Sequence, residues 1–246
     1  MLGLNTSLTQ DYQHVFIDDY SLQFDGADDY VDCDAVVNIT DFQEITGAGS
    51  ISLWVKIGLT SSSGNIIRME TDTSNYISIM YHNGTQQTRA VYRGSGSSTT
   101  ARISDVLEED GVWHHIVSTW STTSNKLRIY LDGSLAQERP SSGSLDTFVG
   151  DIANIDIGQN TNGGSYFKGH VNDLCIFGKE LTAANVTSIY NNGIPSDLLH
   201  IPGIKDEYMY AYYKFEKGTG TVLVDHSGNK KNGTLNNSPT WSTDVP

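Results

Sequence analysis

Apolar and polar side chains alternate along several short stretches of this chain, and the alternation predicts β-strands. In residues 51–57 the odd positions hold Ile, Leu, Val and Ile, while Ser, Trp and Lys fill the even positions. Residues 127–131 repeat the pattern. Because successive side chains of a strand point to opposite faces, we expect half-buried strands in both places. Residues 76–81 and 171–177 carry apolar side chains on both faces, as strands in the middle of a sandwich do.

One short helix is predicted near residue 183. Thr182 is a residue type that caps helix N-termini, and Leu181 and Val186 are spaced as a hydrophobic staple around it. Gly193 followed by Pro195 is typical of a helix end. The helix is therefore expected to run from the Thr182 cap to Gly193.

The composition favours an all-β protein. The chain has 246 residues, with 24 glycines against 5 prolines, which suits many short strands joined by turns. Hydrophobic residues make up 37% and charged residues only 18%, so the chain can fill a core but lacks the Glu and Lys of a helical bundle. One large sandwich is preferred over two small domains.

The charge of the chain excludes several kinds of partner. With a net charge of −14 and 15 basic residues scattered along the chain, no nucleic-acid surface is expected. No apolar run approaches the roughly 20 residues of a spanning helix, so no membrane insertion is expected. Residues 1–7 lack the basic start and apolar core of a secretory signal, which predicts synthesis in the cytoplasm without export by that route.

Three motifs in order carry a family resemblance. Phe24-Asp25-Gly26 follows a short strand pattern, residues 113–120 and 126–133 form a hairpin pattern, and residues 169–177 form a closing strand. Together they resemble laminin G-like domains of the concanavalin A-like lectin and glucanase superfamily. The resemblance implies a two-sheet antiparallel jelly-roll β-sandwich with one short helix.

The carboxy-terminal residues resemble the opening of such a domain. Residues 208–216 and 225–235 resemble the sequence motifs with which a laminin G-like jelly roll usually begins. We therefore expect an arm at 1–20, a sandwich at 21–200, and returning strands at 201–246 that complete it. A circular permutation within one chain is preferred, because the termini of compact domains often lie close together. The alternative is that these strands complete the sheet of a neighbouring copy.

The resemblance also implies a metal site. In family members with a metal, ligands near the opening motif meet an acidic residue of the closing strand, and the matching positions here are Asp25, Gly26, Asp28 and Asp173. Oxygen-only ligands suit calcium, which is the cofactor expected. The alternative is that Asp25 and Asp28 only cap turns through their side chains.

Glycan binding is the family's commonest activity, and it needs aromatic and hydrogen-bonding side chains at loops. Tyr92 and Arg93 beside the Gly–Ser loop, and Tyr166 after a Gly-rich loop, are the candidates. The alternative is that these tyrosines only fill edge strands. For Cys33 and Cys175, the resemblance makes a disulfide conceivable, but two buried thiols are preferred without a secretory signal.

Catalysis is not expected. A retaining glycosidase needs two carboxyl groups facing one cleft, and Asp156 stands alone in its strand pattern without a flanking glutamate. His114 and His115 are adjacent, so in a strand they point to opposite faces and cannot bind one ion. We expect one histidine to be packed in the sandwich and the other to lie on its surface.

Two function classes remain. The resemblance to laminin G-like proteins on phage particles suggests a structural or adhesive virion protein, with other virion proteins, copies of itself or cell-surface glycans as partners. The alternative is a soluble carbohydrate-binding module of a secreted, extracellular protein. The absence of a signal and the start at Met1 favour the virion hypothesis.

Overall fold

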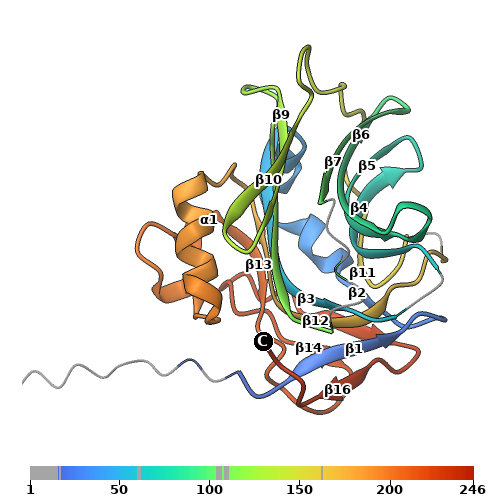
Figure 1. The fold of residues 1–246 in the computed structure, drawn as a ribbon, viewed down its shortest axis with the longest axis vertical. Helices are drawn as coiled ribbons and strands as arrows, with labels where there is room; N and C mark the ends of the chain where they lie inside the picture. Colours follow the sequence, from blue (N-terminus) through green and yellow to red (C-terminus); the bar gives the residue numbers. More distant parts are fainter. Residues whose placement is uncertain (1–15, 17, 60–61, 104–106, 108–110, 162) are drawn as a thin grey trace, which may run out of the picture.

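Two antiparallel β-sheets pack face to face, and one short α-helix lies outside them (Figure 1). The computed structural model describes residues 16, 18–59, 62–103, 107, 111–161 and 163–246. The strands are β1 (Ser21–Asp25), β2 (Tyr30–Asp32), β3 (Ala48–Ile57), β4 (Gly64–Asp72), β5 (Asn75–His82), β6 (Gln87–Gly94), β7 (Ser97–Ile103), β8 (His114–Ser121), β9 (Lys126–Leu131), β10 (Ser134–Arg139), β11 (Asn154–Ile157), β12 (Lys168–Phe177), β13 (Met209–Tyr213), β14 (Val222–Leu223), β15 (Gly233–Asn236) and β16 (Thr240–Ser242). The helix is α1 (Ala183–Tyr190), and 3₁₀ helices span Asp34–Asn38, Phe42–Thr46, Asn83–Thr85, Asn191–Gly193, Leu198–His200 and Asp206–Tyr208.

The strand order defines the two layers. Sheet A runs β10-β9-β8-β3-β12-β1-β16, and β13 also pairs with β12. Sheet B runs β14-β15-β2-β11-β4-β5-β6-β7. Every pairing between these strands is antiparallel. The predicted all-β sandwich of two antiparallel sheets with one short helix is confirmed.

The hydrophobic core lies between the sheets and follows from the alternation of side chains. In β3, Ile51, Leu53 and Val55 belong to this core and are fully buried. Ser52 and Trp54, on the other face of β3, are buried as well. The predicted half-buried strand is therefore wrong for β3, because a further layer of chain covers the outer face of sheet A.

That further layer begins with α1. The Oγ1 of Thr182 accepts a hydrogen bond from the backbone N–H of Asn185, whose side chain accepts in return from the N–H of Thr182, so the predicted cap forms a capping box. The helix ends at Tyr190, before the predicted Gly193. The reason is that Asn191 already takes a left-handed conformation, with φ of 47°.

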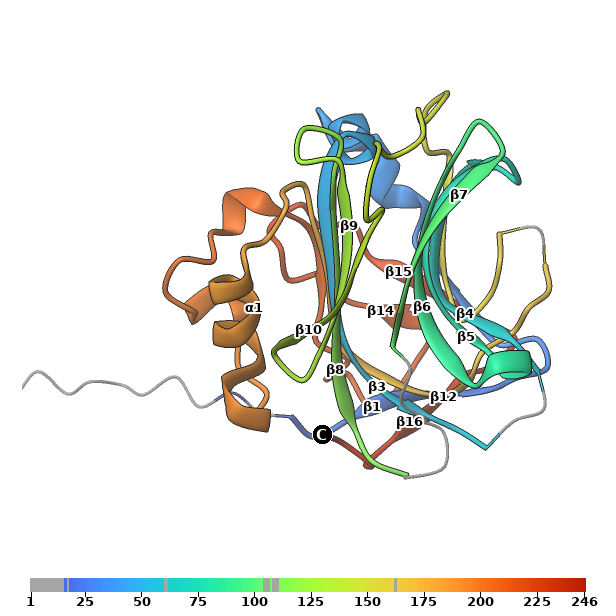
Figure 2. The same cartoon turned by 45° about the horizontal axis from the view of Figure 1, so that its top comes forward.

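The apolar stripe of α1 packs on the outer face of sheet A. Val186 and Ile189 share a second buried cluster with Cys175 and Phe177 of β12. Figures 1 and 2 both show α1 on the side of sheet A that faces away from sheet B. Within the described ranges, no helix has both the length and the apolar character needed to cross a membrane.

Strand β12 is shared by both ends of the chain. One of its edges pairs with β3, while the other edge pairs first with β1 and then with β13. The register against β3 shifts between Asn172 and Cys175, and Asp173 has a left-handed backbone with φ of 49°. This β-bulge lies where the edge passes from β1 to β13.

The carboxy-terminal strands enter both sheets. β13 and β16 pair with β12 and β1 in sheet A, and β15 pairs with β2 in sheet B, all within one chain. A permuted chain requires these pairings, and an exchange between two copies would use the same registers. The choice between the two, and the division into 1–20, 21–200 and 201–246, stays a prediction; residues 1–15 and 17 lie outside the described ranges.

The two cysteines are free and buried. Cys33 belongs to the core between the sheets, whereas Cys175 belongs to the cluster beneath α1. The two thiols are therefore on opposite faces of sheet A. The preferred interpretation of two buried thiols agrees with this arrangement, and the conceivable disulfide does not.

We predict that removing the carboxy-terminal strands destroys the fold. Tyr213 and Phe215 are buried in the core, and each large side chain contributes about 1.5 to 3 kcal/mol. A chain ending at Gly203 should aggregate or unfold, because one edge of β12 loses β13. Solubility and thermal unfolding provide the measurement, and a chain lacking only residues 245–246 is the control.

A shortened chain that stays folded and monomeric contradicts this prediction. If the full chain is an oligomer that the truncation converts into folded monomers, exchange between copies is favoured and permutation within one chain is excluded.

Candidate functional site

Three carboxylates meet in the turn between β1 and β2. Oxygen atoms of Asp25, Asp28 and Asp29 lie within 4.8 Å of one another, and Gly26, with φ of 82°, closes the turn. Asp25 Oδ1 accepts hydrogen bonds from the N–H of Ala27 (2.7 Å) and of Asp28 (3.3 Å). The Ala27 bond is the main reason that the pKa of Asp25 is lowered, whereas burial raises the pKa of Asp29. The cluster is an oxygen-only donor set of the kind that suits calcium.

Asp173 does not lie in this cluster. In the register of β1 against β12, Asp25 lies opposite Lys168. Asp173 is five residues further along β12, which corresponds to roughly 17 Å of strand. Its carboxylate is buried and accepts a hydrogen bond of 2.7 Å from the Tyr212 hydroxyl. The register of β1 on β12 therefore separates Asp173 from the other three predicted ligands.

A second group of carboxylates lies on sheet B. Oxygen atoms of Asp32, Asp34 and Asp156 lie within 4.8 Å of one another. Asp156 Oδ2 accepts a hydrogen bond of 2.9 Å from the Gln159 side chain. Burial, and after it the charges of Asp34 and Asp32, raises the pKa of Asp156 to about 7. A bound cation would relieve this repulsion between carboxylates.

Sheet B is curved. In both views its strands β4 to β7 bow so that the concave side of the sheet faces away from sheet A (Figures 1 and 2). On this face, beside the turn that joins β4 to β5, the Arg68 guanidinium lies 3.6 Å from the centroid of the Tyr76 ring, and Arg68 also pairs with Glu70. Arg93 contacts the same ring at 5.8 Å. We call Arg68, Glu70, Tyr76 and Arg93 the aromatic platform.

The three predicted glycan contacts are placed differently from one another. Arg93 lies in the aromatic platform. Tyr92 is fully buried, and its hydroxyl donates a 2.7 Å hydrogen bond to the Thr46 carbonyl, so it cannot contact a ligand. The prediction failed for Tyr92 because adjacent residues of a strand point to opposite faces. Tyr166 is half-buried, and its backbone forms an isolated β-bridge with Asn65 at the edge of β4.

Several residues of these three groups were missed by sequence analysis. They lie in the turn between β1 and β2, on the outer face of sheet B or in the 3₁₀ helix after β2: Asp29, Asp32, Asp34, Arg68, Glu70, Tyr76 and Asp156. A usable signal was the period of two in residues 76–82, where Tyr, Ser, Met and His alternate with Ile, Ile and Tyr. Asp32 and Asp34 show the same spacing, but their approach to Asp156 depends on the pairing of β2 with β11.

The histidine pair lies on opposite faces of β8. His115 pairs with Trp54 and is buried beneath α1, where its Nε2 is 2.8 Å from the Ser52 hydroxyl. Burial lowers its pKa to about 4. His114 is half-buried, and its Nδ1 lies 2.8 Å from a carboxylate oxygen of Asp132. The buried histidine packs outside the sandwich, under α1, rather than between the sheets.

Two antiparallel sheets, one of them curved and carrying polar and aromatic side chains on its outer face, define a lectin-type jelly-roll sandwich. The chain belongs to the concanavalin A-like lectin/glucanases superfamily, whose family model for laminin G-like domains matches residues 25–187. The laminin G-like resemblance is thereby confirmed. Among curated proteins, adhesion G-protein coupled receptor V1 of Danio rerio is 24% identical over 188 residues. The match covers 72% of this chain but only 3% of the receptor.

Solved structures share this fold. A Bacteroides ovatus protein assigned as carbohydrate binding gives a TM-score of 0.61 at 13% identity, covering 92% of this chain and 60% of that one. A sialidase CBM40 of Ruminococcus gnavus, solved with alpha2,3 sialyllactose, gives 0.55 at 9% identity and covers 69% of this chain and 96% of that one. A pentraxin of Limulus polyphemus gives 0.52 at 15% identity, covering 72% and 83% of the two chains. At these identities the likeness concerns the fold alone.

We predict that stability falls as the pH rises from 6.5 to 8. Burial raises the pKa of Asp173 from 3.8 to about 8, so in this window the native state keeps a proton that the unfolded state has lost. Stability therefore decreases with rising pH, by up to about 1.4 kcal/mol per pH unit for one proton. Unfolding by denaturant at several pH values measures the slope, and Asp173→Asn should make it shallower.

The exposed Asp151→Asn is the matched control and should leave the slope unchanged. Asp156 and Glu216, whose pKa values are raised by burial to about 7, contribute with the same sign, so some slope remains in Asp173→Asn. His115 does not interfere, since its lowered pKa affects stability only below about pH 6.5. An unchanged slope in Asp173→Asn contradicts the prediction.

Proposed function

We propose that this domain is a non-enzymatic carbohydrate-binding module that holds glycans on the concave outer face of sheet B. The observation that carries the proposal is the aromatic platform, in which the ring of Tyr76 lies beside the guanidinium groups of Arg68 and Arg93. A sugar ring can stack on an aromatic face while guanidinium and carboxylate groups bind its hydroxyls. The Nε of Arg93 is buried and has no hydrogen-bond partner among the described residues, so a ligand can supply one.

The similarities support the same function. The Bacteroides protein is assigned as carbohydrate binding, and the Ruminococcus domain was solved with a sialylated sugar. The virion hypothesis, with its virion partners and location, gains no support from the fold or from these proteins and stays a prediction. The binding module, which was the alternative hypothesis from the sequence, is therefore preferred here.

The proposal includes the absence of hydrolysis. On the outer face of sheet B, Glu70 pairs with Arg68, and Asp156 lies against Asp32 and Asp34 in one cluster. Carboxyl groups that work on one glycosidic bond stand roughly 5 to 10 Å apart across the substrate. Neither arrangement offers such a pair around a free cleft, which favours binding without cleavage.

We also propose that calcium binds in the turn between β1 and β2. The ligands are the carboxylates of Asp25, Asp28 and Asp29 together with the carbonyl of Gly26. The support is the close approach of the three carboxylates and the exposure of Asp25 and Asp28, which leaves an ion open to solvent. Asp29 takes the place that the sequence assigned to Asp173. Calcium would fix the turn that leads from sheet A into sheet B.

We predict that Tyr76→Ala weakens glycan binding about tenfold, since the stacking face and the position of both guanidinium groups are lost together. Binding is measured by calorimetry with oligosaccharides selected on a glycan array. Tyr208→Ala is the matched control, because Tyr208 also contacts two cations, Lys179 and Lys205, but lies in the layer outside sheet A.

The same incubations test for catalysis and should release no reducing ends. Equal affinity in wild type and Tyr76→Ala contradicts the choice of face. Release of reducing ends that one carboxylate substitution abolishes contradicts the non-enzymatic assignment.

We predict that calcium raises the thermal stability of the wild type and not that of Asp28→Asn. Asp28 has an exposed carboxylate, so its substitution removes a ligand without exposing the core. An ion at about 100 times its dissociation constant adds about 2.7 kcal/mol. Melting curves with calcium and with chelator provide the measurement. Asp32→Asn, in the second carboxylate cluster, is the control and should keep the stabilisation by calcium. If calcium stabilises Asp28→Asn but not Asp32→Asn, the ion binds to the cluster on sheet B instead.

A further inference from the structure

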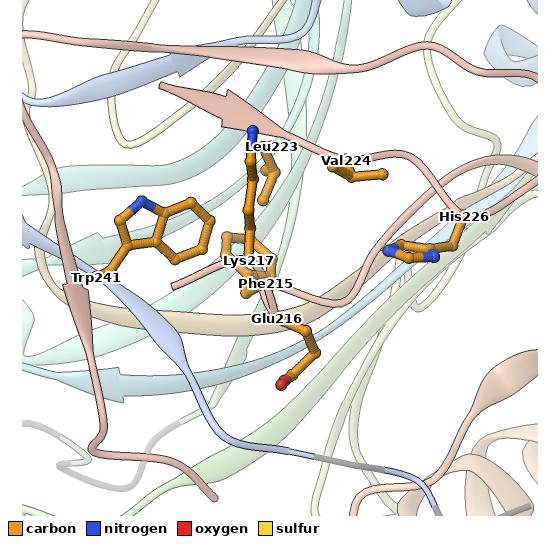
Figure 3. A pocket seen from close by; sticks show the side chains of 7 residues that line it. All are labelled: Phe215, Glu216, Lys217, Leu223, Val224, His226 and Trp241. Atoms are coloured by element: carbon orange, nitrogen blue, oxygen red, sulfur yellow. The ribbon is translucent and has the colours of Figure 1, made fainter. Parts of the chain in front are cut away.

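A small cavity lies among the carboxy-terminal strands, away from the aromatic platform. Its volume is about 200 Å³, and its walls are Phe215, Glu216, Lys217, Leu223, Val224, His226 and Trp241. Figure 3 shows Trp241 at one end and His226 at the other, with Phe215 and Lys217 between them. All these residues follow the segment 25–187 that matches the family model, so the family match assigns nothing to this cavity.

The apolar walls of the cavity are held in place. Phe215 and Leu223 are almost completely buried in the core. The indole of Trp241 is fixed by a hydrogen bond of 2.9 Å from its Nε1 to the Gly220 carbonyl. An indole held in this way presents a rigid aromatic face, which loses little conformational entropy when a ligand stacks on it.

The backbone at Phe215 is strained. Its φ is 62°, a left-handed conformation that is rare and unfavourable for a bulky residue. Such strain persists only where the surrounding structure imposes it, and it occurs most often at binding and catalytic sites. The ring of Phe215 is buried and forms one wall of the cavity. The next two residues, Glu216 and Lys217, also line it.

The polar groups of the cavity combine donors and acceptors with little net charge. Burial lowers the pKa of His226, so its imidazole is neutral near pH 7 and carries one donor and one acceptor. Burial raises the pKa of Glu216 to about 7, although the N–H of Asp19 donates to its Oε2 at 2.9 Å. Lys217 is exposed and has no ion-pair partner among the described residues.

We propose that this cavity binds a single neutral sugar ring, stacked on Trp241 and hydrogen-bonded by Lys217, Glu216 and His226. The size selects the ligand, because about 200 Å³ is below the 300 to 1,000 Å³ of sites for drug-sized molecules and leaves room for one ring only. The mixture of an aromatic face with hydrogen-bond donors and acceptors suits the hydroxyl groups of a sugar. The site is independent of the aromatic platform.

The test uses the full chain and three probes: the methyl glycosides of glucose, galactose and mannose. Saturation-transfer NMR on the wild type should show contact with the ring protons of at least one probe. Lys217→Ala should weaken that binding about tenfold, as expected for the loss of one charge-assisted hydrogen bond. Trp241→Leu should abolish it. Lys217 is exposed, so its substitution leaves the fold intact and decides the test even if Trp241→Leu fails to fold.

Two controls separate this site from the rest of the molecule. Lys230→Ala removes another exposed lysine of the same region, and Tyr76→Ala removes the aromatic platform; both should bind the probe as the wild type does. The proposal is overturned if no probe gives saturation transfer, or if Lys217→Ala binds as tightly as the wild type. It is also overturned if Tyr76→Ala alone loses binding, a result that would assign the probe to sheet B and leave the proposed function standing.

Discussion

The two edges of β12 constrain the whole fold, because a strand offers hydrogen bonds along two edges only. One edge is used by β3, so the strands from the two ends of the chain must divide the other. They meet at the bulge around Asp173, where the ladder is interrupted and the Tyr212 hydroxyl of β13 donates to the buried carboxylate. The Tyr212 side chain of β13 thus supplies a hydrogen bond to the Asp173 carboxyl group, which the bulge of β12 leaves in the interior.

This arrangement also separates a covered face from an open one. Residues 178–208 run from the end of β12 to the start of β13 and lie over sheet A, where they bury Trp54 and His115. Sheet B has no such layer among the described residues, and its outer face carries the polar and aromatic side chains Arg68, Tyr76 and Arg93. The connection that joins β12 to β13 therefore leaves only sheet B with an open face for a ligand.

The candidate sites show where local patterns stop being informative. The turn of Asp25, Gly26 and Asp28 could be read from the sequence, because a glycine and nearby carboxylates act within a few residues. Asp173 could not be placed in the same way, since its distance from Asp25 depends on the register of β1 against β12. Tyr92 was misplaced for a local reason. It is adjacent to Arg93 in the same strand, so the two side chains point to opposite faces and only one of them can face a ligand.

The sequence by itself determined the sandwich of two antiparallel sheets, the capped helix after Thr182 and the family resemblance, because alternation, capping and turn chemistry act between near neighbours. Only the tertiary structure decided that both faces of β3 are buried, that Asp156 lies against Asp32, and that Trp241 and Phe215 enclose a cavity. Each of these depends on pairing and packing between residues far apart in the chain. Such contacts are set by competition for strand edges and buried surface, which no local pattern records.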